Sequence, residues 1–299
     1  MATFIRVVEC GSFALAAESL SLSPSAVSKI ISRLEDRLRV KLLTRTTRKL
    51  ALTVEGERYL EHAREILGAI EAAESEISAA GGKPSGVIRV NVGTAVGKHQ
   101  LAPILGRFLA LYPEISVELS VTDRQIDIIA EQADVVLRTG ALSDSSLQAR
   151  KLTDSHRLIC ASPDYLARHG TPRVPADLLQ HNCLLISRMP HLARWPFHTP
   201  EGINHLKVSG NLVVDNADIL RDMAVRGLGI VRIGEVLVRS ALTRGTLVSL
   251  LEDVHAPETF PTWAVTPPGR ARVHRIRLFI DYLAEAFKTG PSAFPVLPG

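Results

Sequence analysis

The chain has 299 residues, which suits two or three folding units. An apolar fraction of 46% with 22% charged residues excludes a disordered chain. The net charge of +4 does not by itself indicate nucleic acid, but residues 29–49 hold eight basic and two acidic side chains, so the excess positive charge lies in that one segment.

The three cysteines Cys10, Cys160 and Cys183 form no CxxC pair, and their number is odd. This excludes a disulfide framework and fits a reducing cytoplasm, where we expect the protein. Their apolar neighbours predict small buried side chains, with a redox switch as the alternative. No apolar run reaches the ~18 residues of a membrane span, and the first residues do not resemble a signal peptide.

Two short helices are expected first. Residues 2–10 carry Phe4, Val7 and Val8 at helical spacing, and Gly11 gives a C-terminal stop. Ser12 can cap a second helix, whose apolar stripe has the spacing i, i+3, i+4, i+7. That stripe consists of Phe13, Ala16, Ala17 and Leu20.

A third helix follows the turn at 21–22, with Ser23 as its cap and Pro24 at its first position. Its apolar residues are expected to be buried: Val27, Ile30, Ile31, Leu34 and Leu38. Its opposite face is short and polar, which lets the helix backbone approach base edges in a major groove. This predicted DNA-reading set is Ser23, Ser25, Ser28, Lys29 and Ser32, with Arg33 at the margin. A merely solvated helix face is the alternative.

Residues 41–45 and 49–53 alternate enough to form two short strands, which predicts a hairpin, or wing, after the third helix. Arg45, Thr46, Thr47 and Arg48 at its tip offer groups to phosphates or to the minor groove. An exposed, solubilising tip is the other interpretation.

This segment closely resembles the LysR-type transcriptional regulators, densely over about residues 3–60 and more weakly to residue 287. The residues that carry the resemblance are Gly11, Ser12, Phe13, Ala16, Ala17, Glu18, Ser19, Leu20, Ser23, Pro24, Ser25, Ala26, Val27, Ser28, Ile31, Leu34, Glu35, Leu38, Val40, Leu42, Leu43, Arg45, Leu52, Thr53 and Gly56. The family commonly has glutamine where Pro24 stands, so a contact from that position is absent here. The resemblance implies a winged helix-turn-helix DNA-binding domain over residues 1–53.

From Val54 to Ala80 the sequence predicts a linker helix with Thr53 as its cap. Its apolar positions repeat every three or four residues, which is a coiled-coil seam of about three heptads. The seam is Tyr59, Ala63, Ile66, Ile70, Ala73 and Ile77. Pairing with a second copy would present two recognition helices to two half-sites, whereas packing onto the protein's own domain is the alternative. Residues 81–86 are expected to be a hinge.

Beyond the hinge, strands and helices alternate, which predicts an α/β domain over residues 87–288. The expected strands are 87–92, 115–121, 133–138, 158–161, 208–214 and the segment after Gly229, and the expected helices are 101–111, 126–131, one starting at Ser162-Pro163, 216–226 and 273–287. The tail 289–299 is rich in Pro and Gly and is expected to be loose.

No catalytic or metal-binding motif is recognisable, so we expect no enzyme and no cofactor. His191, His198 and His205 recur every seven residues but lie among prolines and turns, and Gly227 and Gly229 suit a tight turn better than a nucleotide loop. Ligands of open α/β sheets bind at strand ends and helix starts, which nominates Thr94, Arg138 and Asn216 as effector contacts. Alternatively Arg138 forms an internal salt bridge, and Thr94 and Asn216 are caps.

The family resemblance implies two α/β subdomains like those of periplasmic binding proteins, with a ligand between them. One would comprise about 87–161 and 267–288, and the other 162–266. We therefore expect a homodimer or dimer of dimers that binds operator DNA and a small organic effector of anionic or polar character. Two other functions stay open: an enzyme fused to a DNA anchor, and a DNA-architectural protein without an effector.

Overall fold

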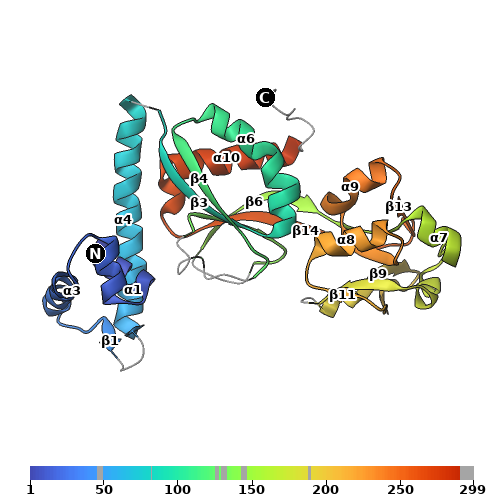
Figure 1. The fold of residues 1–299 in the computed structure, drawn as a ribbon, viewed down its shortest axis with the longest axis horizontal. Coiled ribbons are helices and arrows are strands. Elements are labelled where there is room, and N and C mark those ends of the chain that lie inside the picture. Colours follow the sequence, from blue (N-terminus) through green and yellow to red (C-terminus); the bar gives the residue numbers. More distant parts are fainter. Residues whose placement is uncertain are drawn as a thin grey trace.

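The computed structural model of the chain describes residues 1–45, 50–81, 83–124, 128, 133–142, 147–187 and 190–289. A small helical unit, one long helix and two α/β lobes follow one another along the longest axis of the molecule (Figure 1). Several expectations lie outside the described residues: the wing tip with Thr46, Thr47 and Arg48, Gly82 in the hinge, most of the helix near 126–131, and the tail after residue 289.

The N-terminal unit confirms the three expected helices and their caps. They are α1 Ala2–Cys10, α2 Phe13–Ser19 and α3 Pro24–Leu38. Gly11 ends α1 in the left-handed region at φ 59°. The hydroxyls of Ser12 and Ser23 accept hydrogen bonds from Leu15 and Ala26, which begins α2 and α3 where the sequence places them. The expected hairpin is present as β1 Leu43–Arg45 and β2 Leu50–Leu52, paired antiparallel.

The buried face of α3 differs from the expectation at two positions. Val27, Ile31 and Leu34 are buried, but Ile30 and Leu38 are exposed. Each residue turns a helix by about 100°, so a buried face that includes Glu35 leaves Ile30 at its edge. Leu38 is the last residue of the helix, at its free end.

Glu35, one of the two acidic residues in the basic segment 29–49, is buried, with only 6% of it exposed. Its carboxylate accepts hydrogen bonds from the backbone N–H groups of Leu42 and Leu43, at 2.9 and 3.1 Å, and from Lys41 Nζ at 2.6 Å. Burial by itself raises the pKa of Glu35, but these hydrogen bonds outweigh it and hold the pKa below its ordinary value. The carboxylate thus ties α3 to the start of the hairpin.

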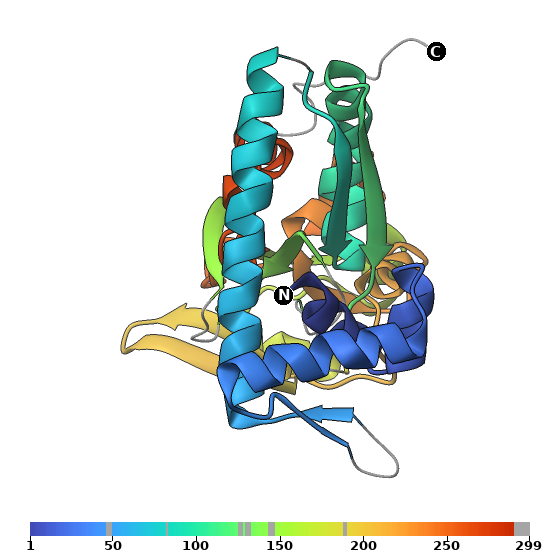
Figure 2. The same ribbon diagram turned by 90° about the vertical axis from the view of Figure 1, so that its left-hand side faces the viewer.

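The linker helix α4 Val54–Gly81 begins at Thr53, whose hydroxyl accepts a hydrogen bond from Gly56 at 2.9 Å. Its first turns pack into the N-terminal core through Leu60 and Ala63, and Tyr59 lies edge-on to Phe4 with ring centroids 5.4 Å apart. The helix α3 and the hairpin β1-β2 lie at the base of this helix (Figure 2). The N-terminal unit and α4 therefore form one packed body.

The first lobe has a five-stranded sheet in the order β4-β3-β5-β14-β6. Its strands are β3 Gly86–Val92, β4 Ile115–Val121, β5 Val135–Thr139, β6 Gln148–Ser155 and β14 Phe260–Thr266. Its helices are α5 Thr94–Val96, the π-turn η1 Gly97–Leu101, α6 Ala102–Leu111, the short η4 Arg270–Arg272 and α10 His274–Thr289. Pairing with β3 is parallel, and β14 runs antiparallel to both neighbours.

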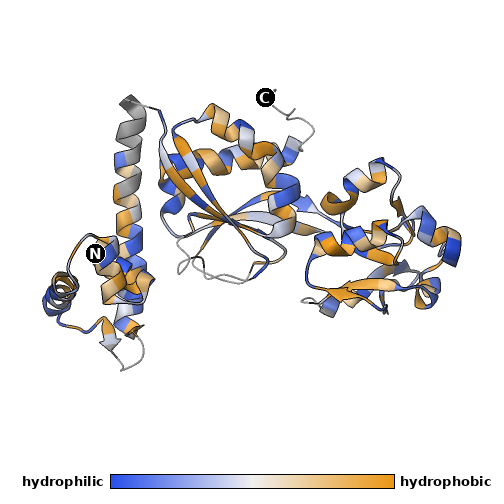
Figure 3. Cartoon of the chain, in the orientation of Figure 1, coloured by the Kyte–Doolittle hydropathy of each residue, from blue (hydrophilic) through white to orange (hydrophobic). Residues whose placement is uncertain are grey.

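The second lobe has a sheet in the order β11-β8-β12-β7-β13 and a separate hairpin, β9-β10. Its strands are β7 Arg157–Ala161, β8 Cys183–Ile186, β9 Arg194–Thr199, β10 Gly202–Lys207, β11 Val213–Val214, β12 Ile230–Gly234 and β13 Val248–Ser249. Its helices are α7 Pro163–His169, η2 Pro175–Gln180, η3 Pro190–Ala193, α8 Ala217–Val225 and α9 Glu235–Thr243. Apolar residues gather along the strands of both lobes, and helices cover them (Figure 3).

The sequence-based division of the chain between the two lobes is wrong at both crossings. Residues 158–161 were expected in the first lobe, but β7 pairs with β12 and β13 of the second, while β14 pairs with β5 and β6 of the first. The chain therefore crosses between lobes at His156 and again between β13 and β14. Sheet membership depends on which distant strand is the pairing partner, and local patterning does not carry that information.

A third correction concerns residues 190–214. The strand expected at 208–214 is reduced to β11, and the two strands of the hairpin β9-β10 were not predicted. Pro190, Pro196 and Pro200 made this stretch look like turns. His198 and His205 lie on opposite strands of this hairpin.

Candidate nucleic-acid interface and ligand cavity

The outer face of α3 is the candidate nucleic-acid interface. Ser25, Lys29, Ser32 and Arg33 are exposed there, and Ser28 is half-buried. The helix runs across one side of the N-terminal unit with the β1-β2 hairpin beside it (Figure 2). The hydroxyl of Ser23 differs from the others, because it caps α3 through Ala26 and lies 3.0 Å from Ser25 Oγ. Short side chains thus cover a helix whose backbone can come close to a groove.

The hairpin is held on the same body as α3. Thr53 Oγ1 donates a hydrogen bond to the carbonyl of Lys41 at 2.7 Å, and Glu35 accepts hydrogen bonds from the backbone at the start of β1. Arg45 pairs with Leu50 in the last described rung, and the tip beyond it lies outside the described residues. The direction of the hairpin is therefore set by α3 and α4.

A cavity of about 880 Å³ lies between the two lobes, a size that suits a small organic molecule. Its walls come from the ends of β3, β4 and β5 in the first lobe and from the ends of β8 and β12 in the second. Thr94 and Arg138 line this cavity, as expected. Asn216 is not among its described lining residues, and its side-chain oxygen instead accepts a hydrogen bond from Ile219 N–H at 3.1 Å, which caps α8.

Arg138 and Thr94 are both held by their own lobe. Arg138 Nη2 donates to Asn91 Oδ1 at 2.7 Å, and its Nη1 donates to the carbonyl of Leu137 at 3.1 Å. The backbone N–H of Thr94 donates to Asp123 Oδ1 at 2.8 Å. Both residues therefore shape the cavity wall from fixed positions, and the internal pairing considered for Arg138 is present through an amide and a carbonyl.

Sequence reasoning missed the cavity residues at the crossovers. Arg157 at the start of β7 and Phe260 at the start of β14 both line the cavity, and the Arg157 Cζ lies 4.4 Å from the centre of the Phe260 ring. Arg157 and Phe260 are 103 positions apart in the sequence. Each lies in a strand that the sequence analysis assigned to the wrong lobe. No local signal brings them together.

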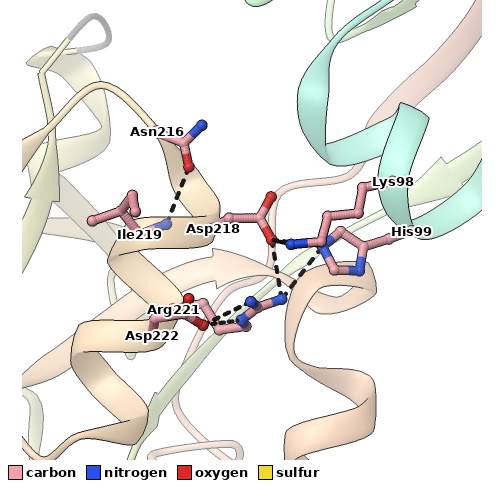
Figure 4. A network of polar contacts seen from close by, with 7 residues as sticks. All are labelled: Lys98, His99, Asn216, Asp218, Ile219, Arg221 and Asp222. Carbon is pink, nitrogen blue, oxygen red and sulfur yellow. Dashed lines mark hydrogen bonds and ion pairs between the residues drawn. The ribbon is translucent and has the colours of Figure 1, made fainter. Parts of the chain in front are cut away.

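A polar cluster beside the cavity links the lobes (Figure 4). Oδ1 of Asp218, on α8, lies 3.0 Å from Lys98 Nζ and 2.9 Å from His99 Nε2, both on η1 of the other lobe. It also contacts Arg221 Nη1 at 3.1 Å, and Arg221 in turn binds Asp222. Burial raises the pKa of Asp218, but the hydrogen bonds from His99 and Lys98 outweigh it and lower that pKa.

The three cysteines differ in burial. Cys160 and Cys183 are buried, as predicted, and burial raises the pKa of each thiol to about 12; Cys10 is half-buried. Over the described part of the chain, no group of three or more His, Cys, Asp or Glu side chains is arranged to hold a metal ion. None of the helices described here is both long and apolar enough to cross a membrane.

Two family models match this chain and together span most of it. Residues 1–57 match a model described as a bacterial regulatory helix-turn-helix protein of the lysR family, and residues 81–288 match a LysR substrate binding domain. The two matches fall on the helical unit with its hairpin and on the pair of α/β lobes.

Full-length relatives are also similar. The chain is 40% identical over 285 residues to the HTH-type transcriptional regulator CrgA of Neisseria meningitidis, covering 95% of each. It is 36% identical to the HTH-type transcriptional activator AaeR of Escherichia coli, covering 96% of this chain and 93% of that one.

The fold agrees with solved structures of such proteins. The structure of CrgA covers 96% of this chain and 97% of its own, with a TM-score of 0.66. That of the full-length virulence activator AphB of Vibrio cholerae, 28% identical, covers 96% and 98% with a TM-score of 0.61.

Proposed function

This chain belongs to the LysR family of transcription regulators, and we propose how its parts carry out DNA binding and its control. The protein is a DNA-binding regulator with a substrate-binding domain, and members of this family form oligomers. In our proposal α3 enters a major groove, where Ser25, Ser28, Lys29, Ser32 and Arg33 face the bases or the adjoining phosphates. The supporting observation is the exposure of this short-chained face next to the hairpin.

We assign the hairpin to the DNA backbone. The basic excess of residues 29–49 is centred on α3 and this hairpin, so both would lie in the field of the phosphates. Arg45, Thr46, Thr47 and Arg48 would contact phosphates or the minor groove beside the helix. Such contacts add affinity without much choice of sequence.

We propose that α4 joins two copies. Its seam is divided: Tyr59 and Ala63 pack on their own N-terminal core, whereas Ile66 and Ile70 are 45% and 49% exposed. Two exposed isoleucines one turn apart on a helix are the pattern that pairs helices. A dimer built through them would present two α3 helices to two half-sites, and a dimer of dimers would extend the same arrangement.

The effector is proposed to bind, unchanged, in the cavity between the lobes. A ligand that touches both walls shifts the equilibrium of lobe positions, and this can alter the geometry of two linked DNA-binding units. The cavity is lined by fixed polar groups such as Thr94 and Arg138, which supports a polar or anionic organic molecule. Asn216 contributes by capping α8 beside the cavity.

We place this DNA-binding regulator in the cytoplasm, where bacterial DNA is found.

One experiment tests the division of labour. Operator fragments are selected from a genomic library by the full-length protein, and a metabolite set is screened for a rise in Tm. A compound that raises Tm must also change the affinity for the selected operator in fluorescence anisotropy, and must be recovered unchanged. Recovery of a converted product would favour the enzyme with a DNA anchor, and the lack of any ligand effect would favour an architectural DNA protein.

A further inference from the structure

A contact between the side chains of Arg157 and Phe260 joins the two segments that connect the lobes. Arg157 directly follows the first crossover at His156, and Phe260 begins the strand that returns the chain to the first sheet. Both connections run between the two lobes in Figure 1, where β14 reaches toward the second lobe. The guanidinium of Arg157 lies over the Phe260 ring at 4.4 Å, a cation–π distance. Any rotation of the lobes must act on this pair.

The backbone of Arg157 is paired with Gly234 in the second sheet, but its guanidinium has no hydrogen bond or ion pair within the described part of the chain. The residue is half-buried and its side chain lines the cavity, where its one described side-chain contact is the Phe260 ring. Burial is the largest cause that lowers its pKa, to about 10, with the charge of Arg232 second. Burial opposes the charge of this guanidinium, and a carboxylate ligand that accepts hydrogen bonds from its N–H groups would offset that cost.

The surroundings leave a net positive charge at this end of the cavity. The side chain of Arg232 is 1% exposed and binds His255 Nε2 at 3.1 Å and Glu258 Oε2 at 3.0 Å, while its Nη1 is buried without a partner in the described residues. Burial lowers the pKa of His255 to about 4, so this ring is neutral near pH 7. Glu258 thus binds Arg232 and acts on Arg157 only through its charge, and His205 also approaches this carboxylate at 3.9 Å.

We propose that Arg157 anchors the carboxylate of an amphipathic organic acid at the hinge end of the cavity. The ring of Phe260 covers one face of the guanidinium, so its N–H edge is the part that can hold a carboxylate with two parallel hydrogen bonds. One excess positive charge matches one carboxylate. Leu142, Leu147, Leu185 and Trp195 also line the cavity and offer apolar surface to the rest of the molecule.

This anchor deepens the function proposed above, since it rests on the cavity being the effector site. Arg138 also lines the cavity, but it already donates to Asn91 and to Leu137 and is fixed to one lobe. Arg157 instead lies where both crossovers meet. A ligand bound there is held by the hinge itself, and it stiffens the contact between the two connections.

The test uses the full-length protein in calorimetry without DNA. The probes are benzoate, phenylacetate and hexanoate, each compared with its neutral primary amide. We expect at least one acid to bind, its amide to bind at least about tenfold more weakly, and Arg157→Met to lower the acid's affinity by about 10- to 100-fold. Arg157→Lys keeps the positive charge but lacks the two parallel N–H donors of a guanidinium. It should therefore recover only part of the lost affinity for the acid.

Arg239→Met on the outer helix α9 is the matched control, since it removes an exposed guanidinium and should leave binding within about twofold. Circular dichroism melting shows whether each variant is folded. Equal binding of acid and amide, binding by none of the three acids, or an unchanged affinity in folded Arg157→Met would overturn the anchor. A larger loss in Arg138→Met than in Arg157→Met would move it to Arg138.

The two proposals fail in different readouts. An acid that binds through Arg157 but changes no operator affinity in anisotropy would refute the regulatory role of the cavity and keep the anchor. A ligand that changes operator affinity independently of Arg157 would keep the regulatory role and refute the anchor.

Discussion

His99 and Asp218 belong to different lobes, yet His99 Nε2 lies 2.9 Å from Asp218 Oδ1. The Asp218 carboxylate is largely buried, and the same oxygen also contacts Lys98 Nζ and Arg221 Nη1. Nitrogen atoms of three side chains therefore converge on one oxygen (Figure 4). Because Lys98 and His99 come from the first lobe and Arg221 from the second, this oxygen joins the lobes next to the cavity. A change in lobe position has to break or reform these contacts.

Asp218→Asn should loosen the link between the lobes. The amide removes the charge that binds Lys98 and His99, and we expect the domain to lose about 2–3 kcal/mol of stability. Hydrogen exchange should rise in α8 and η1. Asp222→Asn, at a position of the same helix where the side chain is 48% exposed, is the control and should stay within about 0.5 kcal/mol. Matching effects of the two substitutions would show that Asp218 does not join the lobes.

The same carboxylate gives a pH dependence. The pKa of Asp218 is lowered in the folded state, so its contribution is fully present above its ordinary value of 3.8 and is lost as the pH falls through the lowered value. Urea unfolding of the wild type at pH 3 and pH 6 should therefore differ more than that of Asp218→Asn. An identical pH dependence in both proteins contradicts this assignment.

Glu35→Gln should weaken the attachment of the hairpin to α3. The substitution removes the charge from a buried group that accepts two backbone hydrogen bonds, and we expect about 1–3 kcal/mol of lost stability in the N-terminal unit. Denaturant unfolding measures the loss. Asp36→Asn on the exposed side of α3 is the control. If Glu35→Gln and Asp36→Asn both lowered the stability by the same small amount, the Glu35 carboxylate would not be what positions the hairpin.

Lys29→Ala on α3 should lower operator affinity and, where Lys29 contacts a base, narrow the difference from random DNA. Ser28→Ala and Ser32→Ala should act mainly on sequence preference. Arg48→Ala in the hairpin should weaken all duplexes alike and reduce the salt slope by about one unit. Salt titrations on operator and scrambled duplexes separate these effects, with Arg173→Ala in the second lobe as control. Equal and specificity-neutral losses for all α3 variants would show that another face reads the DNA.

The double substitution Ile66→Asp and Ile70→Asp should dissociate the oligomer. It places two charges in a shared apolar stripe, where they would remain unpaired. Sedimentation velocity should show lighter species, and operator binding should collapse while the lobes stay folded. Ile203→Asp, on the hairpin β9-β10, changes an isoleucine that is 59% exposed and should leave the mass unchanged. An oligomer that survives the double substitution excludes α4 as its interface.

Local chemistry in the sequence was enough to predict the N-terminal unit. Ser12, Ser23 and Thr53 cap helices through N–H groups three residues away, and Gly11 ends one by adopting a positive φ. Such contacts span less than one helical turn, so the residues that make them are neighbours in the sequence. The alternation of elements likewise predicted the α/β class of the C-terminal region, and strand-end chemistry placed Thr94 and Arg138 at the cavity.

The tertiary structure alone decided how the lobes share the chain and which groups meet in the cavity. β6 pairs with β14 across more than a hundred residues, and the position of Phe260 opposite Ser155 brings it to Arg157. Pairing with β12 and β13 places β7 in the second sheet. Asn216 sits at a helix start as expected, but its side chain turns to the helix N–H instead of the cavity. The packing of the whole core selects which distant strands pair. A window of neighbouring residues does not contain the alternative partners, so it cannot predict the pairing.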